Sequence, residues 1–290
     1  MYPERHRPTK SEVLYNPERL EEIIQEFQKE GADGMHVLAD VDRTLTMAES
    51  APSIISQIRT GGYLGEDYER ATRQLFELYH PIEADYSIKP EERAQHMAEW
   101  QRLSVVNLKK HRLTKQIFDQ IIANPQVQFR PGTAEFFRIL KQRGIPLILI
   151  SGAPKYLVEG HMKQAGIWHN GIHVIANDYE FDENGNLIGQ KEPIIHVANK
   201  SEVVEDDYAH DQDITKRRNV MLLGDNIDDL SMVQSFAKKH LEQLLSIGFL
   251  NDGTNTENRR KYSLAFDAVI TNDGSMDFPN EILEKIIRGK

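Results

Sequence analysis

The sequence predicts an α/β fold in which helices cover both faces of a parallel sheet. Five short apolar runs are separated by segments of helical pattern, which is typical of parallel strands buried on both faces. The runs are HVLAD (36–40), PLILIS (146–151), HVIAN (173–177), VMLLGD (220–225) and DAVIT (267–271). The chain of 290 residues is long enough for one large domain or two modest ones.

Local patterns predict the elements between these strands. An amphipathic helix is expected within 11–31, where apolar residues recur at helical spacing up to a glycine. A second helix is expected over 130–144, with a proline near its first turn and a glycine at its end, and a third over 153–166. An Asn-Gly turn predicts a β-hairpin at 181–189, and the acidic, polar stretch 206–218 predicts a surface loop.

The segment from about 48 to 128 breaks the alternation of strands and helices. It contains the helical patterns EDYERATRQLFELYH, KPEERAQHMAEWQRLSVVNLKKH and TKQIFDQIIAN, with no convincing strand. A helical insert directly after the first strand is a candidate lid, which is useful where a reaction must exclude water or recognise a substrate. The alternative is a helical subdomain that only packs against the rest of the chain.

Composition narrows the class of function. The net charge is −10 and there is no basic tract, which argues against nucleic-acid binding as the main role. The chain contains no cysteine, so disulfides, thiolate zinc sites and cysteine nucleophiles are excluded. The N-terminal segment MYPERHRPTK has no apolar signal region, and no apolar run approaches ~18 residues. We therefore expect a soluble, cytoplasmic protein with no membrane partner.

The run MHVLADVDRTLT is the most informative stretch of the sequence. It places Asp40 and Asp42 two residues apart, just after a buried strand. Such a pair can hold a hard cation, attack phosphorus or move a proton. The alternative is a strand that ends in a turn, where an aspartate side chain accepts hydrogen bonds from nearby backbone amides.

Polar residues at two other strand ends favour the functional interpretation. Ser151 and Gly152 follow the second apolar run, just before a helix, and Asp225 follows the fourth. Each alone can be a helix N-cap. Ligand sites of parallel sheets lie at the carboxyl ends of the strands, so these residues and the Asp40 pair should face one crevice. A hydroxyl and free backbone amides at a helix N-terminus would also bind an anion.

These residue types suit phosphoryl transfer. Mg²⁺ prefers oxygen ligands and usually takes only a few carboxylates, which Asp40 and Asp225 can supply. One carboxylate can attack phosphorus while Asp42 protonates the leaving oxygen and later activates water. The transferring phosphoryl group also needs a nearby cation, for which Lys191 and Lys200 are candidates. On composition alone, a solvated surface lysine is the favoured interpretation of each.

The order DVDRTLT, strand-end Ser151, downstream lysine and LLGDNIDD resembles the four motifs of the haloacid dehalogenase (HAD) superfamily. The resemblance implies a Rossmann-like three-layer core, residues 1–47 and 128–290, and a helical C1-type cap, residues 48–127. More specifically, YHPIEADYSIKPEERAQHMAEW, KEPIIHVANK, LLGDNIDDLSM and IGFLND resemble the pyrimidine 5′-nucleotidase family. Motif two departs from that family, because it is Ser-Gly-Ala here instead of the usual Ser-Ala-Gly.

The resemblance implies a role for each matching residue of the core. Asp40 is expected to be the nucleophile, and Asp42 the general acid and base. Together with Asp225 they are expected to hold Mg²⁺, Asp42 through its backbone carbonyl. Ser151, Gly152 and Lys200 are expected to bind the phosphate, since Lys200 matches the motif better than Lys191 does. Asp229 and Thr44 are expected to support the site.

In the cap, Glu83 falls on the base-recognising glutamate of the family and Ser104 on a nearby substrate-contacting serine. A buried carboxylate can accept a hydrogen bond from the cytosine amine or from uracil N3–H, and it discriminates strongly when a wrong base leaves it unpaired. A solvated acid at a helix end is the alternative for Glu83. Tyr79 and Trp100 are candidates to stack on a base, although such aromatic residues more often belong to the core.

These inferences predict a Mg²⁺-dependent 5′-nucleotidase that hydrolyses UMP and CMP through an aspartyl-phosphate. One alternative is a HAD phosphatase for another small phosphoester, such as phosphoserine or a sugar phosphate. The other is a non-catalytic pseudo-phosphatase that senses a nucleotide, which the intact acid pair argues against. The expected partner is a small nucleoside monophosphate, and a monomer is favoured.

Overall fold

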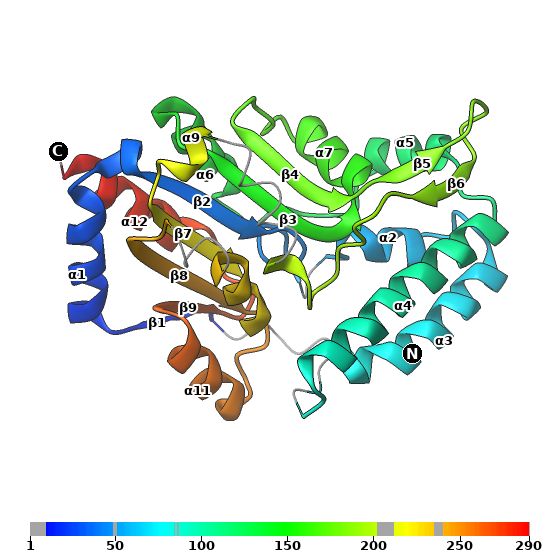
Figure 1. Cartoon of the computed structure of the whole chain (residues 1–290), viewed down its shortest axis with the longest axis horizontal. Helices are drawn as coiled ribbons and strands as arrows, with labels where there is room; N and C mark the ends of the chain where they lie inside the picture. The colour runs from blue at the N-terminus through cyan, green and yellow to red at the C-terminus, as the bar shows by residue number, and fades with distance from the viewer. Residues whose placement is uncertain are drawn as a thin grey trace.

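The computed structural model describes residues 10–48, 51–83, 85, 87–201, 212–234 and 240–289. In this part of the chain the main sheet has the strand order β1-β9-β8-β7-β2-β3-β4. Its strands are β1 (Val13–Tyr15), β2 (Met35–Asp40), β3 (Leu147–Pro154), β4 (Ile172–Asn177), β7 (Asn219–Gly224), β8 (Gln243–Leu250) and β9 (Ala268–Thr271). Neighbouring strands are parallel except for β1, which pairs antiparallel with β9 (Figure 1).

Alternate residues of each strand pack against helices on the two faces of the sheet. In β2, Val37 and Ala39 belong to one apolar cluster and Leu38 belongs to the other. The first cluster includes residues of α1 (Pro17–Gln28), α6 (Thr133–Arg143), α7 (Lys155–Gln164) and α12 (Asp277–Arg288). The second includes residues of α9 (Gln212–Thr215), η2 (Ile227–Val233) and α11 (Thr256–Ala265). The short helix η1 (Gly31–Gly34) leads into β2. The predicted three-layer α/β fold is confirmed.

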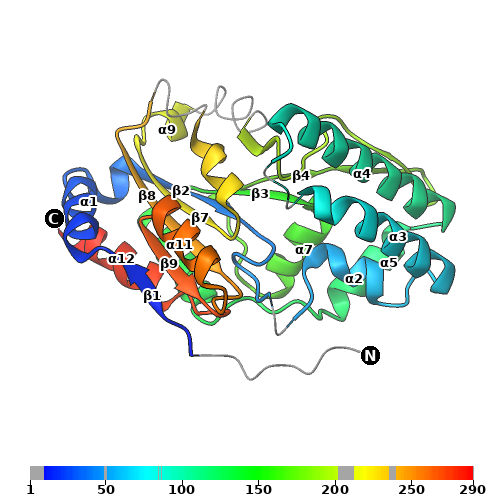
Figure 2. The ribbon, with the colours of Figure 1, turned by 90° about the horizontal axis from the view of Figure 1, so that it is seen from below.

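The regular elements of the insert after β2 are helices in its described residues. It contains α2 (Ile54–Thr60), α3 (Glu66–Glu83), α4 (Pro90–Lys110) and α5 (Lys115–Ala123). In Figures 1 and 2, α3 and α4 lie side by side at the end of the molecule toward which β2 and β3 point. Among the described residues, no helix combines the length and the apolar character needed to cross a bilayer.

The predicted hairpin is present and joins the helical insert. Strands β5 (Tyr179–Phe181) and β6 (Leu187–Gln190) pair antiparallel around the Asn-Gly turn, where Gly185 has a positive φ of 78°. Its backbone bonds to the insert, since Lys115 N donates to Gly185 O at 2.8 Å and Leu187 N donates to Leu113 O at 3.0 Å. This contact brings a segment outside 48–127 into the helical part of the molecule.

Strands β1 and β8 were missing from the sequence prediction. The first lies within the segment 11–31 that was expected to be helical, and the helix begins only at Pro17. The run LLSIGFL is apolar apart from a serine and a glycine, and a glycine inside a strand pattern weakens that signal. The structure explains the glycine, because a Cβ at Gly248 would lie 2.6 Å from the ring of Phe266. The expected loop 206–218 lies mostly outside the described residues. Its described end is not a plain surface loop, since Ile214 in α9 is buried.

The strand that carries Asp40 also contains a buried histidine. His36 is fully buried, and its Nδ1 lies 2.8 Å from Arg217 O, where a neutral ring can donate. Burial lowers the pKa of His36 to about 4, outweighing the hydrogen bond to the Arg217 backbone. The folded protein therefore keeps His36 neutral at pH values where the unfolded chain binds a proton.

We predict that His36 makes the protein sensitive to acid. Its depressed pKa contributes stability above pH 6.5 that is lost as the pH falls toward 4, which amounts to about 2 kcal/mol at pH 5. The loss of unfolding free energy between pH 7.5 and 5, measured by urea denaturation, should be smaller by about this amount in His36→Gln. An equal loss in the variant and the native chain would contradict the prediction.

Candidate active site

The polar strand ends predicted from the sequence meet at one edge of the sheet. In the register of the strands, Asp40 lies opposite Ile150 of β3, and Ala39 lies opposite Leu223 of β7. Ser151 and Gly224 are therefore at the level of Asp40 or one residue away from it. Backbone pairing thus places all three segments at the same end of the sheet.

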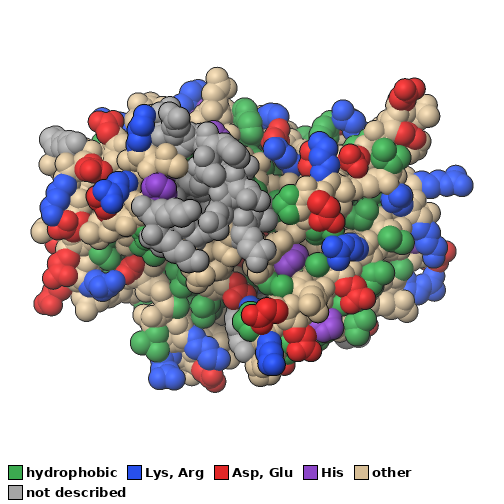
Figure 3. All heavy atoms as spheres, in the orientation of Figure 1, with side chains coloured by type: hydrophobic (Ala, Val, Ile, Leu, Met, Phe, Trp, Pro, Cys, Tyr) green, Lys and Arg blue, Asp and Glu red, His purple; other side chains and the backbone are tan. Residues whose placement is uncertain are grey.

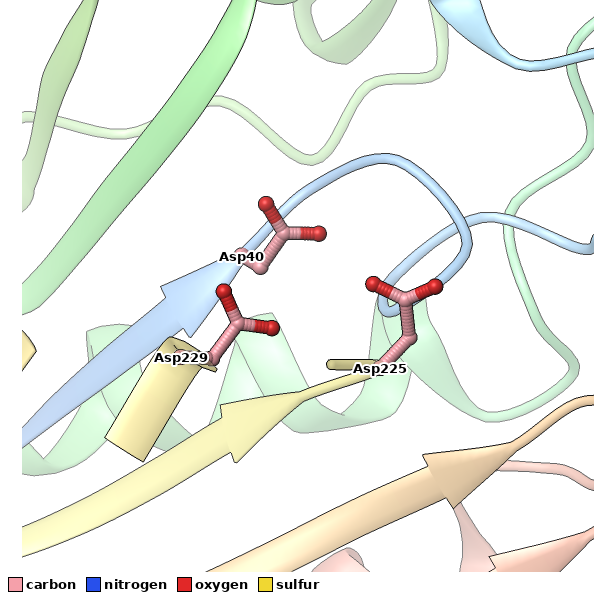
Figure 4. A group of neighbouring side chains, drawn as sticks. All are labelled: Asp40, Asp225 and Asp229. Carbon is pink, nitrogen blue, oxygen red and sulfur yellow. The ribbon is translucent and has the colours of Figure 1, made fainter. Parts of the chain in front are cut away.

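Three carboxylates converge at this edge. Oxygen atoms of Asp40, Asp225 and Asp229 lie within 4.8 Å of one another, and Figure 4 shows the three groups turned toward a common space. Asn226 caps η2 in a capping box with Asp229, so Asp225 is not the N-cap and its side chain reaches the cluster. The close approach of Asp229 requires Gly224, where a Cβ would lie 2.6 Å from the Asp229 side chain.

A buried lysine bridges two of these acids. Lys200 Nζ donates to Asp40 Oδ1 at 2.6 Å and to Asp229 Oδ1 at 2.8 Å. Although burial acts to lower it, the pKa of Lys200 is raised by Asp229 and Asp40, so the ammonium stays charged. Lys191, the other candidate, instead pairs with Asp178 on the surface.

The cation is local to the site. On the visible part of the face in Figure 3, basic and acidic side chains are interspersed and no broad basic patch is present. The described side chains of this face therefore give no broad positive potential that would attract an anion.

The cluster has the properties of a divalent cation site. Burial raises the pKa of Asp40 to about 7; Lys200 opposes this effect, and Asp229 and Asp42 add to it. Burial, Asp40 and Asp229 raise the pKa of Asp225 well above its ordinary value, against the opposing effect of Arg43. In addition, Thr44 Oγ1 is buried and has no hydrogen-bond partner among the described residues. Oxygen donors short of positive charge suit a hard metal ion.

Asp42 connects the core to the helical insert. Its Oδ1 accepts a hydrogen bond of 2.6 Å from Ile54 N, the first residue of α2. Burial raises the pKa of this half-buried side chain, and the backbone hydrogen bonds of Ile54 and Ile55 partly oppose the rise. A carboxyl group with a raised pKa can exist in both protonation states, as a general acid and base must.

Motif two differs from the expected strand-to-helix junction. Strand β3 continues through Pro154 and α7 begins at Lys155, so Ser151 is not the cap of a helix and lies outside its N-terminal turn. A bulge after Ser151 explains the longer strand, and its buried Oγ accepts from Ala153 N at 3.1 Å. Ser151 and Gly152 therefore lie in an irregular strand end and not at the helix N-terminus where the sequence placed them. A Cβ at Gly152 would meet its nearest atom at 3.6 Å, so the family's usual alanine would fit there.

A buried arginine holds the loop that carries the acid pair, and sequence reasoning missed it. Arg130 is 2% exposed and donates to Thr44 O at 2.7 Å and to Arg43 O at 2.6 Å. It also donates to Gly274 O at 2.7 Å and pairs with Asp273 at 3.3 Å. Its partners are mostly backbone carbonyls distant in sequence, which leave no local sequence signal.

The two residues predicted to contact the base, Glu83 and Ser104, lie on different helices and have different surroundings. Glu83 ends α3, is partly exposed, and its Oε2 lies 3.0 Å from His80 Nδ1. Ser104 Oγ donates to Trp100 O within α4 at 2.8 Å, so its hydrogen is used inside the helix. Tyr79 is buried and stacks on Trp100, with ring centroids 5.9 Å apart. Contact of Glu83 or Ser104 with a substrate remains a prediction.

An ion pair joins the insert to η2, the short helix that carries Asp229. Arg93 of α4 lies 2.9 Å from Asp228 Oδ2 and donates to Glu83 O at 3.2 Å. Asp228 lies next to Asp229 in η2. The sequence analysis did not predict this pair, because Arg93 and Asp228 lie in segments that are far apart in the sequence. The contact ties the end of α3 to motif four.

The sheet order and the three-layer arrangement are those of a HAD-type phosphatase fold, and the acid cluster with its buried lysine is the candidate active site. A probable phosphoserine phosphatase from Vibrio cholerae matches at a TM-score of 0.55 with 14% identity, covering 89% of this chain and 67% of its own, which supports the fold alone. The structure of cytosolic 5′-nucleotidase IIIB bound to cytidine matches much better. Its TM-score is 0.81 at 28% identity, and the match covers 97% of this chain and 95% of that one.

The chain belongs to the pyrimidine 5′-nucleotidase family (UMPH-1), which it matches over residues 41–287. Its relatives include 7-methylguanosine phosphate-specific 5′-nucleotidase B of Xenopus laevis, 31% identical, with 93% of this chain and 94% of the relative covered. The enzyme of that specificity from Drosophila melanogaster is also 31% identical and covers 94% of this chain and 86% of its own length. The protein is a 5′-nucleotidase and thus a phosphoric monoester hydrolase.

We predict that Arg130 is essential to stability. Arg130→Met removes the cation that pairs with Asp273, which keeps only neutral hydrogen bonds such as that from Ala48 N, and it removes a donor from three loop carbonyls. The free energy of unfolding should fall by about 3–5 kcal/mol. Urea denaturation measures this change. The control is Arg138→Met on the exposed face of α6, where the arginine pairs only with its neighbours and a small effect is expected. Equal effects of the two substitutions would contradict the assignment.

Proposed function

We propose that the protein is a Mg²⁺-dependent 5′-nucleotidase for pyrimidine nucleoside monophosphates such as UMP and CMP. The observation that carries the chemistry is the bridge of Lys200 between Asp40 and Asp229, beside Asp225, at the carboxyl ends of parallel strands. We also propose residues 48–127 as the cap that selects the substrate.

The proposed reaction gives a separate role to each of the two acids. Asp40 attacks phosphorus, the bond from phosphorus to the 5′ oxygen breaks, and Asp42 gives its proton to that leaving oxygen. Asp42 then takes a proton from water, which attacks the phospho-Asp40 and releases inorganic phosphate. Lys200 balances the charge of the phosphoryl oxygens, and Ser151 with Gly152 positions them. Asp229 and Thr44 support these groups.

The metal requirement rests on the acid cluster. Asp40, Asp225 and the backbone carbonyl of Asp42 would hold Mg²⁺, which when bound would offset the charge of the phosphate and of the clustered acids. The carboxylates that repel one another in the cluster would then be stabilised together. Asp40 would be kept ionised, as its role as a nucleophile demands.

The choice of base is proposed from the family and from the cap. The family is described as pyrimidine 5′-nucleotidase, and the structural relative 5′-nucleotidase IIIB holds cytidine. Glu83 would accept a hydrogen bond from the base, with Ser104 nearby. The second candidate is 7-methylguanosine monophosphate, because several relatives are named for it. For small phosphoesters such as phosphoserine, the support is weaker, because this chain shares only its fold with the neighbour named for that substrate. A cytosolic location and a monomeric state are further proposals, the first supported by the name of 5′-nucleotidase IIIB.

We predict that Asp40→Asn abolishes phosphate release from CMP and UMP, because an amide cannot attack phosphorus. The native chain should release phosphate from both nucleotides with Mg²⁺ and not after chelation with EDTA. The variant should unfold at the same temperature as the native chain or higher, since one repelling carboxylate has been removed. The control is Asp33→Asn, which removes the same charge from an exposed side chain. Full turnover by Asp40→Asn would end the proposed mechanism.

We predict that Glu83→Ala lowers base selectivity more than catalysis. The kcat/KM for CMP should fall by about tenfold or more, as expected when a hydrogen bond to a charged group is lost. Turnover of a small phosphoester such as p-nitrophenyl phosphate should change little, because the acid cluster is intact. If the ratio of the two activities is unchanged, Glu83 does not contact the base. The matched control is Glu77→Ala, an exposed acid of the same helix.

A further inference from the structure

A half-buried arginine in the insert is unexplained by the proposed chemistry. Arg59 lies in the last turn of α2, the helix whose first residue bonds Asp42. Its guanidinium carbon lies 5.0 Å from the ring centroid of Phe76, a distance typical of a cation–π contact. Its Nε is buried and has no hydrogen-bond partner among the described residues. A buried guanidinium N–H without a partner is costly and therefore uncommon.

The neighbours of Arg59 belong to both ends of the proposed nucleotide site. Burial lowers the pKa of Arg59, while Tyr68, Asp42 and Glu83 act on its charge in the opposite direction. Asp42 is the proposed acid at the phosphate end, and Glu83 is the proposed acceptor at the base end. Arg59 is therefore a fixed positive charge within electrostatic reach of both.

The aromatic contacts of Phe76 extend this surface toward Glu83. His80 stacks on Phe76 with centroids 4.5 Å apart, and its Nδ1 lies 3.0 Å from Glu83 Oε2. Trp100 meets Phe76 edge to face at 6.1 Å. An aromatic surface with a carboxylate would attract a cationic base, but here the guanidinium already lies on Phe76 and offsets the charge of Glu83.

The candidate substrates differ in charge at this position. Cytosine and uracil are neutral at pH 7, whereas N7-methylation places a formal positive charge on the imidazole ring of guanine. Two cations in a partly desolvated site repel each other much more strongly than in water. On the basis of the proposed function, we propose that Arg59 is a specificity-determining residue that excludes nucleotides with a cationic base and so favours neutral pyrimidines.

The test compares nucleotides that differ in base charge. The kcat/KM is measured for CMP, GMP and 7-methylguanosine 5′-monophosphate in the native chain, Arg59→Met and Arg59→Lys. Arg59→Met should raise the ratio of 7-methylguanosine monophosphate to CMP by about tenfold, while the ratio of GMP to CMP stays the same. Arg59→Lys, which keeps the charge, should keep the native ratios. Arg70→Met removes an exposed arginine of α3 and should change neither ratio.

Several outcomes would overturn the proposal. The first is an unchanged ratio of 7-methylguanosine monophosphate to CMP in Arg59→Met. The second is an equal rise of the GMP to CMP ratio, which would mean that the variant gained space and did not merely lose a charge. The third is a native enzyme that prefers 7-methylguanosine monophosphate. If the variants lose turnover, binding of cytidine and 7-methylguanosine by calorimetry gives the same comparison, and equal discrimination by native chain and variant overturns the proposal. A native chain that binds cytidine but hydrolyses none of the nucleotides would refute the proposed function and leave the role of Arg59 to the binding ratio.

Discussion

Mutual repulsion among buried carboxylates is the constraint on which this structure depends. Asp40, Asp225 and Asp229 lie within 4.8 Å of one another at the carboxyl ends of β2 and β7. Burial raises the cost of their charges, and only Lys200 contacts two of them directly among the described residues. The arrangement is unfavourable for the folded protein alone, and the proposed dication and phosphate would offset the repulsion. A site of this kind stores its electrostatic cost until substrate and metal offset it.

Such a cluster must be held by the rest of the fold. Arg130 fixes the loop after β2 by donating to the carbonyls of Arg43 and Thr44, and its own charge is balanced by Asp273. Arg43 takes a left-handed backbone conformation, with a φ of 67°, and its Nε lies 3.3 Å from Asp225 Oδ2. The strained loop and the repelling acids are therefore stabilised by one buried guanidinium that takes no part in the reaction.

The sequence predicted the framework well because the framework has local signals. Strands such as HVLAD and VMLLGD are apolar runs of the right length, and Asp40 and Asp225 come where those runs end. Lys200 could be chosen over Lys191 only by resemblance, since both are single lysines in polar segments. Arg130, Arg59 and the pair Arg93–Asp228 could not be predicted, because their partners are backbone carbonyls, ring faces or charges brought near only by the fold. The Ser151 strand end was misread, since a bulge has no sequence pattern of its own.

Helix α2 joins the two halves of the proposed function. Its first amide donates a hydrogen bond to the side chain of Asp42, the proposed general acid and base, and its last turn carries Arg59 on the ring of Phe76. A movement of the insert would therefore shift both Asp42, the proposed proton donor, and Arg59, the cation proposed to act near Glu83. Arg93 adds a second tie, from α4 to the helix of Asp229 and to the Glu83 carbonyl. Because the same short contacts connect recognition to chemistry, a base that does not fit beside Arg59 and Glu83 would also disturb the placement of Asp42. Selectivity would then appear in kcat as well as in KM.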